Sequence, residues 1–177
     1  MSAFDQSLIL IGMPGAGKST LGLLLAKHLA KDFVDTDLLI QLEQRRTLHD
    51  ILREQGHLAL RDTEEKILLN AHYPNHVIAT GGSAVYSAPA MRHLKQFGPI
   101  IFLDVGIEAL QQRFSDMNSR GVARAPEQTF ADVFAERYPL YLQYADIVID
   151  CRNKSIEQLI DEIICHQGQD YASTQDA

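Results

Sequence analysis

The stretch of sequence that decides the fold reads GMPGAGKS, from Gly12 to Ser19. It matches the pattern G-x-x-x-x-G-K-[ST], in which backbone N–H groups surround a phosphate and glycines keep side chains out of the way. The apolar run of residues 8–11 precedes it and predicts a buried strand. The leucines of residues 18–30 recur at helical spacing. A loop between a strand and a helix favours a nucleotide phosphate site over a simple glycine-rich turn.

The chemistry of this phosphate loop assigns roles to its last residues. The helix that follows directs its first N–H groups and its dipole at a bound anion. Lys18 is placed to reach the β- and γ-phosphates, and the Ser19 hydroxyl is placed to ligate Mg²⁺. We therefore expect ATP and Mg²⁺ as cofactors, with the nucleotide bound by Gly15, Ala16, Gly17, Lys18, Ser19 and Thr20.

Strand and helix patterns alternate along the rest of the chain. Short apolar strands are predicted at residues 33–34, 77–79, 100–103 and 147–149. Helices are predicted at residues 38–45, 48–54, 58–72, 108–116, 130–144 and 156–165, with Gly56 ending the second and Pro139 expected to kink or split the fifth. Apolar strands that alternate with helices indicate a three-layer α/β/α fold with a five-stranded parallel sheet.

Length, composition and charge limit the class of protein. The 177 residues suit a single domain, expected at residues 1–166, with a flexible polar tail at 167–177. No membrane span or signal peptide is apparent, so we expect a cytoplasmic monomer with no membrane partner. The formal charge of −7 argues against nucleic-acid binding. Cys151 and Cys165 are expected to be reduced thiols rather than a disulfide or a zinc site.

Two acidic residues follow the second predicted strand. Asp35 and Asp37 lie close enough in sequence to suit work on a metal ion and on a hydroxyl group. An aspartate at this position also suits the N-cap of a helix, so the pattern alone leaves both interpretations open.

Five signatures together resemble the shikimate kinase family of P-loop kinases, which has the nucleoside-monophosphate-kinase-like fold. The resemblance extends from about residue 8 to residue 163. The signatures are DTD at residues 35–37, LRDTE at 60–64, ATGGS at 79–83, ERYPLYLQYAD at 136–146, and the stretch from Arg113 to Arg120. The resemblance implies an ATP-dependent kinase that phosphorylates shikimate.

The same resemblance implies roles at the acceptor end of the site. Asp37 would bind the acceptor hydroxyls and take the proton of the attacking one, while Asp35 would help hold the water shell of Mg²⁺. Arg61 and Arg137 would bind the substrate carboxylate with their planar guanidinium groups. Gly82 would contact the substrate through its backbone.

Further roles are implied around these groups. Glu64, on the same helix face as Arg61, would hold that arginine in place. Arg113 would stack on the adenine, and Lys154 would border it. Arg120 would belong to a lid near residues 114–128 and neutralise charge on the transferring phosphoryl group. The catalytic set is then Lys18, Asp37 and Arg120.

Departures from the family pattern concentrate near the acceptor and the lid. Leu60 replaces an aromatic residue, Ser83 replaces a third glycine, and Gly121 replaces the proline of the lid. Two alternatives therefore stay open. One is a kinase for another anionic acceptor, such as a gluconate-type sugar acid or a nucleoside monophosphate. The other is a nucleotide-binding regulator without transfer activity.

Overall fold

Five strands form one parallel sheet in the computed structural model, which describes residues 6–115 and 122–173. They are β1 (Leu8–Ile11), β2 (Asp32–Asp35), β3 (His76–Ala79), β4 (Ile100–Asp104) and β5 (Ile147–Asp150). Their order across the sheet is β2-β3-β1-β4-β5. In this register Ile9 lies opposite Ile78 on one side and Ile100 on the other. The five parallel strands predicted from the sequence are confirmed.

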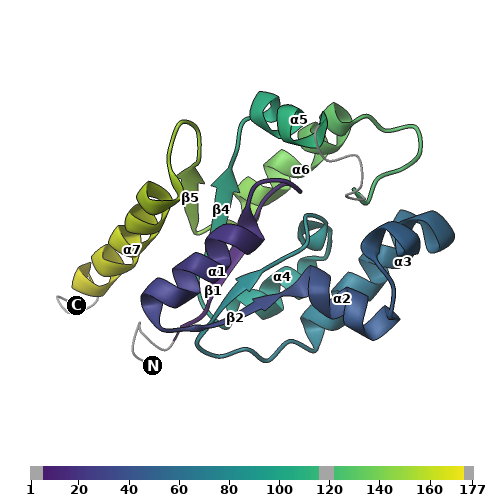
Figure 1. The fold of residues 1–177 in the computed structure, drawn as a ribbon. Helices are drawn as coiled ribbons and strands as arrows, with labels where there is room; N and C mark the ends of the chain where they lie inside the picture. The colour runs from purple at the N-terminus through teal and green to yellow at the C-terminus, as the bar shows by residue number, and fades with distance from the viewer. Residues whose placement is uncertain (1–5, 116–121, 174–177) are drawn as a thin grey trace.

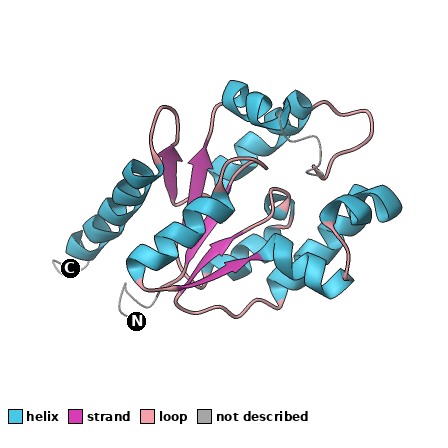
Figure 2. Ribbon diagram, in the orientation of Figure 1, coloured by secondary structure: helices cyan, strands magenta, loops and turns pink. Residues whose placement is uncertain are grey.

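Helices cover both faces of this sheet (Figure 1). They are α1 (Lys18–Leu29), α2 (Thr36–Gln44), α3 (Leu48–Leu69), α4 (Ala88–Lys95), α5 (Ile107–Ser115), α6 (Phe130–Tyr144) and α7 (Ile156–Ser173), with a 3₁₀ turn η2 (Ala84–Tyr86). α1 and α7 pack together on one face, and α4 and α6 lie on the other. Figure 2 shows the alternation of strands and helices that makes every strand run in the same direction.

The central strand β1 explains why an unbroken apolar run is needed at this point of the sequence. Its four residues, Leu8 to Ile11, are completely buried, because helices cover both faces of a parallel sheet. Leu21 and Leu25 of α1 are buried as well and belong to the same core. The phosphate loop is thus held between two elements that are anchored in the core.

Several predicted boundaries need correction. The break at Gly56 is confirmed, since this residue has φ 83° inside α3, but the helix ends at Leu69 rather than at residue 72. Pro139 does not split α6, because Arg137 and Tyr141 on either side of it are buried and anchor the helix. α7 continues to Ser173, so the tail expected to be flexible from residue 167 is helical over its first part.

One helix escaped the sequence analysis. α4 begins after Ser87, whose hydroxyl accepts a hydrogen bond from the Ala90 N–H at 3.1 Å, and it has a proline in its first turn. Both are usual helix-start signals. Among the helices of the described residues, none combines the length and the apolarity that a membrane span requires.

Candidate active site

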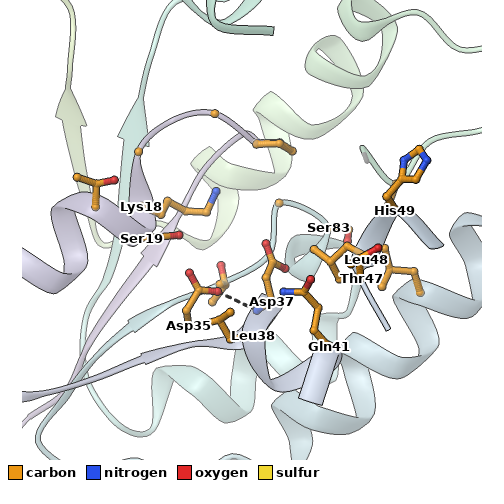
Figure 3. A pocket seen from close by; sticks show the side chains of 18 of the residues that line it. Lys18, Ser19, Asp35, Asp37, Leu38, Gln41, Thr47, Leu48, His49 and Ser83 are labelled. Carbon is orange, nitrogen blue, oxygen red and sulfur yellow. Dashed lines mark hydrogen bonds between the residues drawn. The ribbon is translucent and has the colours of Figure 1, made fainter. Parts of the chain in front are cut away.

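A pocket of about 740 Å³ lies at the carboxyl ends of β1, β2 and β3. This is the edge at which parallel α/β sheets bind ligands. Figure 3 shows Lys18 and Ser19 on one side of the pocket, Asp35 and Asp37 in the middle, and Ser83 beyond them. The predicted site residues that line it are Gly15, Gly17, Lys18, Ser19, Thr20, Asp35, Asp37, Gly82 and Arg137.

The phosphate loop takes the backbone shape that its sequence predicts. Gly15 and Gly17 have φ of 82° and 93°, a region that side chains disfavour. Lys18 is buried, and its Nζ donates to the carbonyls of Gly12 at 2.7 Å and Met13 at 3.0 Å. Burial lowers the Lys18 pKa to about 8, against the attraction of nearby carboxylates, first that of Asp37. The ammonium group thus sits inside the loop, beside the phosphate position.

Of the two interpretations that the sequence left open for Asp35, the N-cap is confirmed and the metal role stays a prediction. Asp35 is the N-cap of α2, and its Oδ1 accepts a hydrogen bond from the Asp37 N–H at 2.9 Å. It also lines the pocket together with Ser19. Mg²⁺ needs only one or two carboxylates when phosphates and waters complete its octahedron. A serine hydroxyl and a buried carboxylate on one pocket wall therefore fit that ion.

The turn after β3 packs closely against its neighbours because Gly81 and Gly82 have no side chains. It lies between the acidic residues Glu64 and Asp37 and the phosphate loop. A Cβ on Gly81 would overlap Glu64 Oε1 and lie 2.7 Å from Asp37 Oδ1. A Cβ on Gly82 would lie 2.6 Å from Pro14 Cδ in the phosphate loop. The Tyr141 hydroxyl donates to the Gly82 carbonyl at 2.7 Å and fixes the turn from the side of α6.

Glu64 has a different partner from the one that the sequence suggested. Its side chain is buried, and Oε2 accepts a hydrogen bond from the Ser83 hydroxyl. Burial, together with the neighbouring Asp37 carboxylate, raises the Glu64 pKa to about 7. The expectation that Glu64 holds Arg61 is therefore wrong. Ser83 stands where the family pattern has glycine, and its hydroxyl turns the acid toward the turn after β3.

The two arginines predicted to bind the substrate both contact Tyr86, a residue that the sequence analysis missed. The Arg61 guanidinium lies 3.6 Å from the centre of the Tyr86 ring, and that of Arg137 lies 5.2 Å from it. Arg137 is completely buried, donates from Nε to the Tyr86 hydroxyl at 3.3 Å and from Nη2 to the Ala123 carbonyl. Nothing in the spacing of the sequence singles out Tyr86, because both of its contacts come from distant helices.

The residues predicted near the adenine lie apart from the pocket lining. Arg113 Nη1 donates to the Gly15 carbonyl at 2.8 Å, so this side chain lies against the phosphate loop. Lys154 follows β5 and pairs with Glu162 at 2.5 Å. Arg120 and Gly121 fall outside the described residues, so their predicted part in a lid stays a prediction.

Comparisons with known proteins agree on one family. The family model described as shikimate kinase matches residues 14–166. A shikimate kinase of Persephonella marina is 34% identical over 160 residues, which cover 90% of this chain and 97% of that protein. The solved shikimate kinase of Acinetobacter baumannii in complex with shikimate gives a TM-score of 0.80 at 30% identity, covering 90% of each chain. That of Aquifex aeolicus gives 0.75 at 27% identity, covering 94% and 98%.

Proposed function

The chain belongs to the shikimate kinase family, and on this premise we propose that it transfers the γ-phosphoryl group of ATP to shikimate. The products are ADP and shikimate 3-phosphate. One observation carries the proposal: the phosphate-loop lysine, Asp37, Gly82 and Arg137 line a single pocket. The solved relative that contains shikimate supports this acceptor.

At the nucleotide end, the backbone N–H groups of the loop from Gly15 to Thr20 hold the phosphates. Lys18 exchanges its carbonyl contacts for phosphate oxygens, and the negative charge of ATP restores its full protonation. Ser19 and Asp35 would hold Mg²⁺, Asp35 through bound water. The ion supplies charge neutralisation at the β- and γ-phosphates.

At the acceptor end, Asp37 orients the attacking hydroxyl and accepts its proton. It lies in the first turn of α2 and lines the same pocket as Lys18. Gly82 contacts the ring of the acceptor, while Arg61 and Arg137 bind its carboxylate. Phosphoryl transfer depends mainly on position and charge, so a fixed acceptor supplies most of what the reaction needs.

Further assignments complete the proposal. Arg113 and Lys154 border the adenine, and Arg120 acts on the transferring phosphoryl group from a lid near residues 114–128. We also propose a monomer, to be checked by size-exclusion chromatography. Because ATP is the donor, we assign the reaction to the cytoplasm.

A coupled ADP-release assay tests the function. Shikimate is expected to raise ADP release far above the rate with ATP and Mg²⁺ alone, and mass spectrometry should identify shikimate 3-phosphate. Gluconate and nucleoside monophosphates, assayed in parallel, cover other anionic acceptors. A higher kcat/KM for one of them would replace shikimate as the acceptor. Tight ATP binding without any phosphorylated product would instead indicate a regulator.

A further inference from the structure

An aromatic ring lies between two positive charges beside the pocket: Arg137 lines the pocket, while Tyr86 and Arg61 lie behind its lining. Tyr86 lies at the end of η2 and is half-buried. Its ring supports the guanidinium of Arg61 from α3, and its hydroxyl accepts from Arg137 of α6. The face of an aromatic ring attracts a cation, and the hydroxyl oxygen attracts an N–H donor. One side chain thus contacts both arginines in different ways.

Two acidic residues, Glu64 and Glu136, lie near this cluster. Glu64 is bound by Ser83, and within the described part of the chain Arg61 Nε and Glu64 Oε1 are buried without a hydrogen-bond partner. Glu136 is hydrogen-bonded by the Gln128 amide at 2.7 Å, and its carboxylate also interacts with the Tyr86 hydroxyl and with the charges of Arg61 and Arg137. No ion pair joins either arginine to a carboxylate among residues 6–115 and 122–173. The Tyr86 ring therefore contacts the Arg61 guanidinium directly, whereas Glu136 attracts it from beyond ion-pair distance.

We propose that Tyr86 positions Arg61 and Arg137 so that both guanidinium groups meet the carboxylate of the acceptor. The proposal rests on the proposed function, since it concerns the same acceptor site. Two arginines repel each other when they converge. Glu136 offsets part of this repulsion, and the carboxylate of the acceptor relieves more of it once it is bound. Tyr86 holds the pair together beforehand, which lowers the cost of ordering their long side chains on binding.

Two substitutions separate the contribution of the Tyr86 ring to shikimate binding from that of its hydroxyl. Tyr86→Phe keeps the ring under Arg61 and removes the acceptor of the Arg137 bond, so we expect KM for shikimate to rise about threefold. Tyr86→Leu removes both contacts and should raise KM about tenfold to thirtyfold. KM for ATP should stay within about twofold in both variants, because Tyr86 contacts Arg61 and Arg137 rather than the phosphate loop.

The carboxamide of shikimate provides the decisive comparison. It keeps the ring and hydroxyls but lacks the charge that the arginines bind, so Tyr86→Leu should change its KM by less than about threefold. Tyr73→Leu is the matched control. Tyr73 is a half-buried tyrosine whose ring contacts His76 rather than Arg61 or Arg137, and its loss should leave both KM values unchanged.

Three outcomes would overturn the positioning role. One is an equal penalty for shikimate and its carboxamide. Another is an equal rise in KM for shikimate and for ATP. The third is a fall in melting temperature with no change in KM. Tyr86→Phe keeps the test valid if the leucine variant does not fold. Failure of the wild-type chain to phosphorylate shikimate would instead contradict the proposed function, so the two failures are distinguishable.

Discussion

Replacing Ser83 by alanine should destabilise the protein, and the loss should depend on pH. The Ser83 hydroxyl donates to Glu64 Oε2, and Glu64 Oε1 is one of the buried atoms of the described residues without a hydrogen-bond partner. The alanine variant would therefore leave both oxygens of a buried carboxylate without a donor. A buried charged group without hydrogen bonds is costly because it has given up its water.

The size of the effect depends on the charge of Glu64. Burial raises its pKa from 4.5 to about 7. The folded protein therefore binds this proton more tightly than the unfolded chain, so stability from this group is fully present below pH 4.5 and is lost as pH rises through 7. At pH 8 the lost bond has a charged acceptor and should cost about 2 kcal/mol, against about 1 kcal/mol at pH 5.5.

Thermal unfolding at the two pH values measures this difference. A loss of 1 kcal/mol lowers Tm by about 2–4 °C in a chain of this size, so we expect about 4–8 °C at pH 8 and half of that at pH 5.5. Ser87→Ala is the matched control, because this hydroxyl caps α4 by accepting from a backbone N–H, and its cost should not change with pH. Adding Glu64→Gln should abolish the pH dependence of the Ser83→Ala cost. If Ser83→Ala alone lowers Tm equally at both pH values, the reasoning is refuted.

Three further changes test the active site. Lys18→Met removes the buried ammonium and should lower kcat about 100-fold or more, with weaker ATP binding by calorimetry. Asp37→Asn should lower kcat about 100-fold or more while ATP affinity changes less than about twofold; unchanged turnover would exclude Asp37 as the base. Gly82→Val should clash with Pro14 and weaken the binding of both ATP and shikimate, which is measured by the KM for each. Weaker binding of shikimate alone would contradict the contact between Gly82 and the loop.

Much of the fold was predictable from local patterns. The run from Leu8 to Ile11 is apolar throughout because both faces of its strand are covered, and the glycines of the loop mark backbone shapes that other residues disfavour. The break at Gly56 was readable for the same reason. Asp37, Gly82 and Arg137 could be named because they lie in recognisable signatures, and the fold brings them to one pocket.

The extent of the helices was less predictable, because helical propensity is weak compared with packing. Pro139 lies within α6 since buried residues on both sides hold that helix in place. α7 continues beyond Cys165, its last predicted residue, to Ser173 and includes Gly168, although glycine has a low helix propensity.

Short-range sequence patterns determined the phosphate loop, the parallel sheet and the chemical class of the acceptor residues. They did so because each depends on backbone shape or on periodicity within a few positions. Only the tertiary structure decided which groups pair inside the acceptor site. Ser83 meets Glu64 across 19 positions, and Tyr86 meets Arg137 across 51. A side chain chooses between such partners by distance and burial in the folded chain, and neither is encoded at any single position.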